Sequence, residues 1–149
     1  MNDPHRGPKN TARTEQAQPH RDQRRALGRR GEQLAAAHLQ RLGFKLVEQN
    51  VRTRHGEIDL IMFNGKVLVF AEVKTRRAEN RRRSSCPQEQ PLAWLKLSQR
   101  ARLRKLACAW LYENARARPT AHTIRFDAVG VILDDADRLL SLNHIEGAW

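Results

Sequence analysis

Two stretches of the chain carry apolar residues at the spacing of an α-helix. From residue 24 to 43 the apolar positions recur every three or four residues, and Gly43 supplies a stop at the end. Residues 92–117 repeat this pattern, with leucines and a tryptophan on one stripe and arginines over much of the remaining surface, and Pro119 ends it. The pattern predicts two amphipathic helices, each with one face for a core.

Other apolar runs alternate with polar residues or continue without interruption, as is typical of strands. The predicted strands are residues 44–51, 57–63, 66–74, 123–133 and 139–145, the last of them an edge strand. Residues 57–63 and 66–74 are apolar on both faces, which indicates central strands covered above and below. The chain is therefore predicted to have an α/β fold.

The N-terminal segment differs from the rest in composition. Residues 1–23 hold three prolines and almost no large apolar side chains, so they cannot bury enough surface to order themselves. We expect a disordered basic arm over residues 1–23 and a single domain over residues 24–149. Residues 75–91 are polar and rich in arginine, and two prolines within them predict a loop.

The turn between the two central strands decides which side chains meet. Asn64-Gly65 is the dipeptide most typical of a two-residue type I′ hairpin. The pairs that this turn predicts are Phe63 with Lys66, Ile61 with Leu68, Asp59 with Phe70 and Glu57 with Glu72. The side chains sharing one face of the sheet are then Glu57, Asp59, Phe70, Glu72 and Lys74. Asp59 is expected diagonal to Glu72, with about 7–8 Å between their α-carbons.

Carboxylates on such apolar strands need a partner. Glu57 opposite Glu72 would place like charges face to face, which destabilises a strand pair unless a cation, hydrogen bonds or protonation compensates. A hard divalent ion with oxygen ligands fits, and Mg²⁺ commonly takes one or two carboxylates plus a substrate phosphate. Lys74 would then stabilise charge at that phosphate or position a water. The plainer alternative is an exposed Glu72–Lys74 pair worth about 0–1 kcal/mol.

Two further features favour structural roles. Asp127 interrupts the strand 123–133, and we expect it to bind a neighbouring arginine or backbone group rather than a metal. Cys86 and Cys108 lack metal-ligand spacing and do not suggest a disulfide framework, and Cys108 is expected to be a small core residue.

The charge balance points to a polyanionic partner. The 149 residues include 28 Lys and Arg against 16 Asp and Glu, a formal net charge of +12, and much of the excess lies in arginine runs. Nucleic acid is the commonest such partner, although a basic protein kept soluble by self-repulsion has the same balance. The residues expected to contact nucleic acid are Arg76, Arg77, Arg81, Arg82, Arg83, Arg100 and Arg104.

Neither the apolar runs nor the N-terminus indicates a membrane or secretory protein. No apolar run approaches about 20 residues, the length that spans a bilayer. The N-terminus has no hydrophobic stretch for a secretory signal. We therefore expect a cytoplasmic protein that does not use a membrane.

Several motifs resemble those of the YraN family of bacterial endonuclease-like proteins. They are Gly31-Glu32, Gly56-Glu57-Ile58-Asp59-Leu60-Ile61, Phe70-Ala71-Glu72-Val73-Lys74-Thr75-Arg76, Ala107 with Trp110-Leu111, and Arg125-Phe126-Asp127. The resemblance covers residues 26–133. It implies the PD-(D/E)xK nuclease superfamily, related to Holliday junction resolvases, with a restriction-endonuclease-like three-layer fold. In that αβββαβ core, helices flank a central mixed sheet.

The resemblance also implies roles for individual residues. Asp59 and Glu72 would bind the divalent ion, Mg²⁺ or Mn²⁺, while Lys74 would orient the attacking water and Glu32 would complete the acidic set. Glu57 matches a family position without a settled role, and Gln99 is the polar residue expected from the second helix. Ile58 stands where the superfamily pattern has proline.

The leading hypothesis is a metal-dependent endonuclease that hydrolyses phosphodiester bonds in DNA, including branched or structured DNA. Pairing of two copies into a homodimer is compatible with resolvase-like relatives. A nucleic-acid-binding protein with a nuclease-like core and no turnover, acting in recombination, repair or uptake of DNA, is the alternative. A structural, ribosome-associated basic protein explains the charge but not the carboxylates on the hairpin.

Overall fold

The computed structural model describes residues 17–53, 55–78 and 97–148. Within these ranges the elements are α2 (Ala17–Arg41), β1 (Lys45–Thr53), β2 (Gly56–Phe63), β3 (Val67–Arg77), α4 (Leu97–Glu113), β4 (Thr123–Leu133) and β5 (Leu139–Ile145). The strands form one sheet in the order β1-β2-β3-β4-β5. Only β3 and β4 run parallel, and the other neighbouring strands are antiparallel, so the sheet is mixed. The predicted α/β class is confirmed.

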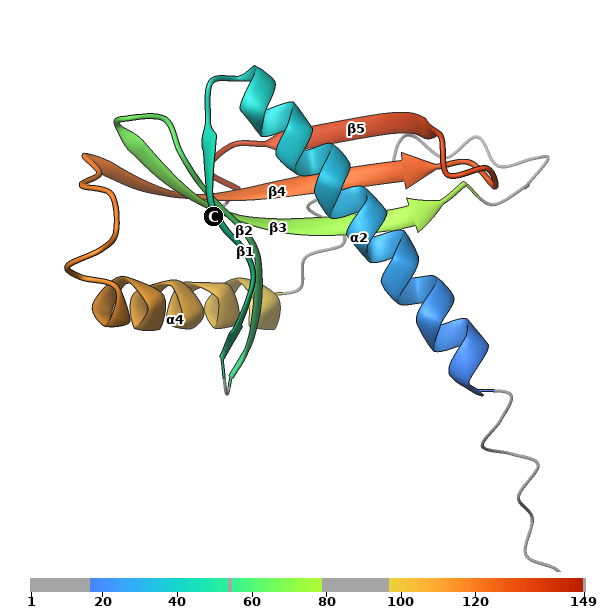
Figure 1. The fold of residues 1–149 in the computed structure, drawn as a ribbon, viewed down its shortest axis with the longest axis horizontal. Coiled ribbons are helices and arrows are strands. Elements are labelled where there is room, and N and C mark those ends of the chain that lie inside the picture. Colours follow the sequence, from blue (N-terminus) through green and yellow to red (C-terminus); the bar gives the residue numbers. More distant parts are fainter. Residues whose placement is uncertain (1–16, 54, 79–96, 149) are drawn as a thin grey trace, which may run out of the picture.

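The two helices cover opposite faces of the sheet, and β3 is its central strand (Figure 1). On one face, Ala35 and Leu39 of α2 pack with apolar side chains of β2, β3 and β4. On the other face, Leu106 and Trp110 of α4 pack against Phe70 and its neighbours. Burying a large aliphatic or aromatic side chain contributes about 1.5–3 kcal/mol, so both faces of β3 are strongly stabilised. This explains the run of apolar residues in β3 without alternation.

The predicted element boundaries agree with the structure best toward the C-terminus. The strands predicted over residues 123–133 and 139–145 are confirmed as β4 and β5. The first helix begins at Ala17, seven residues before its predicted start at residue 24. The loop predicted to begin at residue 75 starts later, because β3 continues to Arg77. Residues 79–96 lie outside the described residues.

Gly31 brings α2 close to the sheet. A Cβ at this position would lie 1.7 Å from Thr75 Oγ1 and 2.8 Å from Thr75 Cβ on β3. Both distances are far below van der Waals contact, so any larger residue would push the helix away from the strand. The absence of a side chain at residue 31 therefore places the next residue, Glu32, near the sheet.

Asp127 is a buried structural anchor, as the sequence predicted. Its carboxylate accepts hydrogen bonds from Arg125 Nε at 2.9 Å and from the Gly147 amide at 3.0 Å, and its Oδ2 lies 2.9 Å from His144 Nε2. Burial raises the pKa of Asp127, but these hydrogen bonds outweigh it and hold the pKa below its ordinary value. The carboxylate joins β4 to β5 and the residues that follow.

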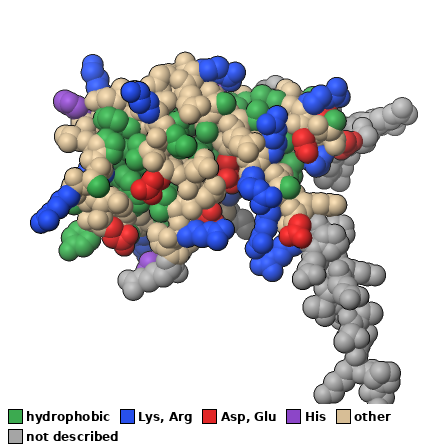
Figure 2. Space-filling model, viewed as in Figure 1, with side chains coloured by type: hydrophobic (Ala, Val, Ile, Leu, Met, Phe, Trp, Pro, Cys, Tyr) green, Lys and Arg blue, Asp and Glu red, His purple; other side chains and the backbone are tan. Residues whose placement is uncertain are grey.

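Two surface observations correct or extend the sequence analysis. Cys108 is exposed on α4, so its prediction as a core residue is wrong. Lys and Arg side chains occur at many separate points of the face that α2 covers (Figure 2). In the described part of the chain, no helix is both long enough and apolar enough to cross a membrane.

Candidate functional site

The hairpin that carries the predicted carboxylates has a different register from the one expected. Phe63 pairs with Leu68 and Leu60 with Ala71, two residues away from the predicted partners on β3. The reason lies in Asn64, whose side-chain oxygen accepts hydrogen bonds from the amides of Lys66 and Val67. This closes the turn around residues 65–66 instead of residues 64–65.

A shift of two residues by itself leaves the side chains of the paired residues, 60–63 and 68–71, on their predicted sides of the strands. It does change the partners. The expected face-to-face pair of Glu57 and Glu72 does not form, because the ladder between β2 and β3 ends at Leu60 and Ala71. Extending the observed register brings Asp59, rather than Glu57, level with Glu72.

Asp59 lies where β2 and β3 separate. Ile58 and Ile61 both contact the core beneath α4, although they are three residues apart, so the alternation of side chains breaks between them. The Asp59 carboxylate bridges the gap, since its Oδ2 accepts a 2.7 Å hydrogen bond from the Val73 amide of β3. This bond takes the place of backbone pairing and holds the carboxylate beside Glu72.

Asp59, Glu72 and Lys74 line one pocket of about 500 Å³, together with residues at the adjoining ends of β1 and β2 and with Arg102 of α4. We call it the carboxylate pocket. Glu72 is nearly buried, with 7% of its side chain exposed, and its Oε1 accepts a hydrogen bond from Lys74 Nζ. Lys74 is more accessible, at 33%. The ammonium therefore lies nearer the open side of the pocket than the Glu72 carboxylate.

The electrostatics of the carboxylate pocket are unfavourable for two charged acids. Burial and then the negative charge of Glu72 raise the pKa of Asp59 to about 7, with Glu32 adding a smaller contribution. The Val73 amide and Lys74 act in the opposite direction and do not compensate. A cation placed between the two carboxylates would relieve this repulsion.

Glu32 approaches the carboxylate pocket from α2. Burial and the charge of Glu57 raise its pKa, while a hydrogen bond from the Asn50 side-chain amide lowers it. Asn50 adopts a positive φ of 54° within β1, a conformation that asparagine tolerates better than most residues. The register of β1 and β2 places Asn50 level with Asp59, so its hydrogen bond holds Glu32 where the charge of Glu32 acts on Asp59.

Glu57 and Arg102 lie at the rim. Glu57 Oε2 is 3.8 Å from Arg52 Nε in an exposed pair. Arg102 reaches over from α4 and crosses Gly56, where a Cβ would lie 3.5 Å from both its Cδ and its Nε. Gly56 has a φ of +142°, which other residues rarely adopt. The glycine therefore allows the backbone conformation with which the chain enters β2 beside Arg102.

The remaining predicted residues do not all gather at this site. Gln99 lies on α4 but does not line the carboxylate pocket. Arg77 donates to the backbone oxygens of Asp134 and Asp135 and to the Asp137 carboxylate, so its guanidinium is bound to the β4–β5 turn. Arg76 lies in β3, and Arg100 and Arg104 lie on α4. The three further arginines, Arg81, Arg82 and Arg83, lie outside the described residues.

Sequence reasoning missed three residues around the carboxylate pocket: Asn50, Arg52 and Thr53. It included Arg102 only among the arginines of residues 100–105 that were expected to hold the nucleic-acid backbone. For Asn50 a signal existed, since asparagine is depleted in strand interiors and marks unusual backbone conformations. No pattern distinguished Arg102 from the other arginines along the same helix.

The donor set fits a hard divalent cation. Carboxylate oxygens are the ligands that Mg²⁺ prefers, and it usually takes only one or two of them together with waters and phosphate oxygens. Within the described residues no group of three Asp, Glu, His or Cys side chains is arranged to enclose an ion. Asp59 and Glu72 would therefore hold an ion from one side and leave its other positions open.

The fold and the pocket define a mixed α/β protein with a paired-carboxylate site at the point where two central strands separate. The model of the uncharacterised protein family UPF0102 matches residues 31–131, and the chain belongs to this family. The sequence resemblance to YraN proteins is thereby confirmed.

Individual relatives agree with this assignment. The chain is 40% identical over 133 residues to a UPF0102 protein of Acidothermus cellulolyticus, which covers 85% of this chain and 95% of the relative. It is 41% identical over 125 residues to a UPF0102 protein of Geobacter sulfurreducens, and this match covers 83% of this chain and 88% of the relative.

Proposed function

We propose that this protein is a metal-dependent endonuclease of the PD-(D/E)xK type that hydrolyses phosphodiester bonds in DNA, including branched or otherwise structured DNA. One observation carries the proposal: Asp59 and Glu72 meet in a pocket whose open side presents Lys74. The strand motifs that resemble YraN proteins supply these three residues. The helix-covered mixed sheet, with its parallel β3–β4 pair, is compatible with a restriction-endonuclease-like arrangement.

The chemistry requires a water oxygen to bond to phosphorus while one phosphorus–oxygen ester bond breaks. The leaving oxygen takes up a proton, and the products are a phosphate monoester and a free hydroxyl. A Mg²⁺ or Mn²⁺ ion held by Asp59 and Glu72 would lower the pKa of bound water and neutralise charge developing at phosphorus.

The chain's own residues contribute binding and orientation. Lys74 stands at the pocket opening, where its ammonium can pair with a phosphate oxygen and position the water. Arg52 and Arg102 border the same pocket and supply positive charge for the flanking backbone. Glu32, held by Asn50, adds a third carboxylate near the two metal-binding candidates.

The experiment is a cleavage assay with labelled duplex, nicked, branched and single-stranded DNA in the presence of Mg²⁺ or Mn²⁺. We expect Asp59→Asn and Lys74→Ala to reduce cleavage by about 100-fold or more, the scale on which removing one stabilising group acts. Both variants should retain most DNA binding. Asp135→Asn, the same chemical change on an exposed carboxylate of the β4–β5 turn, serves as the matched control.

Two outcomes would contradict the proposal. One is equal cleavage by the parent protein and both site variants, which would place the chemistry elsewhere. The other is DNA binding by the parent with neither metal uptake in calorimetry nor cleavage of any substrate, which would favour a binding protein without turnover.

A further inference from the structure

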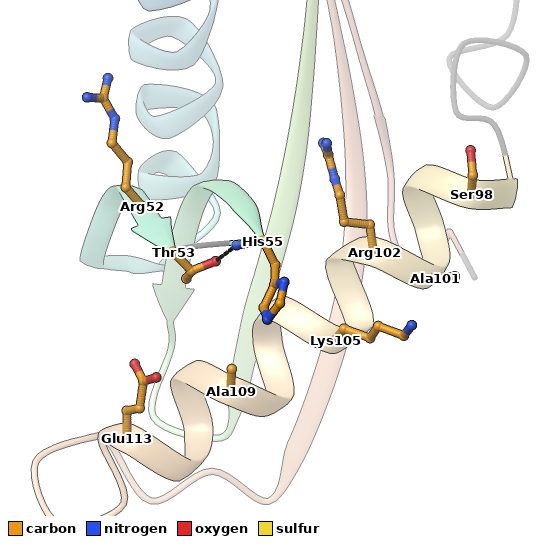
Figure 3. A pocket seen from close by; sticks show the side chains of 9 residues that line it. All are labelled: Arg52, Thr53, His55, Ser98, Ala101, Arg102, Lys105, Ala109 and Glu113. Carbon is orange, nitrogen blue, oxygen red and sulfur yellow. Dashed lines mark hydrogen bonds between the residues drawn. The ribbon is translucent and has the colours of Figure 1, made fainter.

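A second, larger hollow lies beside the carboxylate pocket, between the β1–β2 turn and α4. It measures about 1190 Å³. The residues on the turn side are Arg52, Thr53 and His55, and those on α4 include Ala101, Arg102 and Lys105. Figure 3 shows Arg102 and Lys105 projecting from the helix and the ring of His55 on the facing turn. We call this hollow the α4 groove.

The side of α4 that borders the groove follows from helical spacing. Ala101 and Arg102, Lys105 and Ala109 succeed one another at intervals of three or four residues, so they form one stripe. The core stripe of the same helix runs through other positions, such as Leu103 and Leu106. The alanines leave space next to the cations, which allows a ligand backbone to approach the helix closely.

The charge of the groove favours an anionic occupant. Arg102 and Lys105 contribute two positive charges, Arg52 adds a third that is paired with Glu57, and Glu113 supplies a carboxylate only at the far end. Within the residues that the structure describes, neither Arg102 nor Lys105 forms an ion pair with an acidic side chain. Their charge is therefore available to a ligand, and a polyphosphate backbone matches a row of such cations.

The groove and the carboxylate pocket are continuous. Arg52, Thr53 and Arg102 line both hollows, and Arg102 passes across Gly56 at the boundary. A phosphate beside Lys74 would thus be followed along the same strand by phosphates near Arg102 and then Lys105. The groove provides a path away from the place where the proposed reaction occurs.

The shape favours one strand over two. A concave channel with cations on its walls is the common means of binding single-stranded nucleic acid, in which a positive groove follows the backbone and rings stack on bases. A duplex, in contrast, presents both backbones on a broad convex surface and does not require a channel between a turn and a helix.

We propose that the α4 groove binds a single nucleic-acid strand, so that the substrate carries a locally single-stranded segment next to the phosphodiester that is cut. Overhangs, flaps and splayed junction arms share this feature. That the bound strand is a substrate rests on the proposed function, whereas the binding itself requires no cleavage.

The test is fluorescence anisotropy in EDTA with three labelled probes: a single-stranded oligonucleotide, a blunt duplex of the same sequence, and that duplex with a single-stranded overhang. We expect Lys105→Glu to weaken binding of the single strand and the overhang by about tenfold and to lower the salt slope by about 0.7, the value for one phosphate contact on a single strand. Binding of the blunt duplex should change by less than about threefold.

Two companion variants make the result specific. Lys45→Glu is the same charge reversal on an exposed lysine at the other end of β1, and it should affect single-strand binding far less than Lys105→Glu. Ala101→Trp fills the groove without altering charge, and because residue 101 is exposed it leaves the core intact. It should also weaken single-strand binding.

Equal losses for Lys45→Glu and Lys105→Glu, or equal losses for the blunt duplex and the single strand, would overturn the groove assignment. Unchanged binding by Ala101→Trp would do the same. If the groove variants behave as expected but the parent protein cuts no substrate with either metal, the proposed function fails and the single-strand site stands. If the parent cuts DNA and the groove variants bind the single strand normally, the single-strand site fails and the proposed function stands.

Discussion

The partly buried carboxylate of Asp59 makes a sharp prediction about how the stability of the protein depends on pH. The pKa of this group rises from 3.8 to about 7 on folding, because of burial and the charge of Glu72. Between these two pH values the folded protein keeps a proton that the unfolded chain releases. Stability contributed by this group therefore falls as pH rises from about 4 to about 7, and above about pH 7 the full penalty is present.

The magnitude follows from the size of the change. At about 1.4 kcal/mol per pH unit, the penalty reaches an upper value of about 4 kcal/mol. The carboxylate pocket is open to water on one side, and the solvent screens its charges. We therefore expect the metal-free parent to lose about 2 kcal/mol of unfolding free energy from this source between about pH 5 and about pH 8.

The perturbation is Asp59→Asn, which removes the charge and keeps an oxygen that can accept from the Val73 amide. The assay is urea unfolding of both proteins in EDTA across that pH range. We expect the variant to become more stable relative to the parent as pH rises, so that its unfolding free energy exceeds that of the parent by about 2 kcal/mol more at pH 8 than at pH 5. Asp135→Asn, on an exposed carboxylate, should follow the parent at every pH.

A divalent ion should reverse the effect. Because ion binding requires both carboxylates to be deprotonated and relieves their repulsion, Mg²⁺ or Mn²⁺ should raise the melting temperature of the parent more at about pH 8 than at about pH 5. Asp59→Asn should show little of this increase. A constant stability difference between parent and variant from pH 5 to pH 8 would refute the reasoning about the pocket.

Two further predictions concern the elements that support the site. Gly31→Ala should destabilise the protein by about 1–3 kcal/mol in thermal unfolding, because its Cβ would lie 1.7 Å from Thr75 Oγ1. Gly28→Ala, one turn earlier with its nearest atom at 3.9 Å, should be neutral or stabilising by up to about 1 kcal/mol, and equal melting temperatures for the two variants would contradict this packing. Asn50→Gly should preserve stability, since glycine accepts the positive φ, but lower the cleavage rate by removing the hydrogen bond to Glu32. Asn50→Ala should lower both the stability and the cleavage rate. A parental cleavage rate in Asn50→Gly would show that Glu32 does not need the hydrogen bond from Asn50.

Most of the secondary structure could be predicted, because each element has a strong local pattern. The boundaries of β4 and β5 agree with the prediction, since polar turns at residues 134–138 separate two clear strand patterns. The start of α2 does not agree with the prediction, because residues 17–23 lack the apolar stripe that marks a helix. Nothing in their hydrophobic pattern distinguishes a helix extending into solvent from an irregular arm.

The candidate site was partly predictable for a related reason. The two-residue period of a strand keeps Glu72 and Lys74 on one side, whatever the register. The register itself depended on whether the turn closes at residues 64–65 or 65–66. The Asn64 side chain, which binds two amides of the turn, decided this in favour of the second.

The sequence by itself therefore determined the order of helices and strands, the positive charge and the presence of carboxylates on two central strands, because these are properties of short segments. Only the tertiary structure decided that β2 and β3 separate at Asp59, and that Asn50 of β1 and Arg102 of α4 arrive beside it. These residues come together although they lie up to about fifty positions apart in the chain. They depend on how the packed faces of the helices and the twist of the sheet align, which local sequence patterns do not encode.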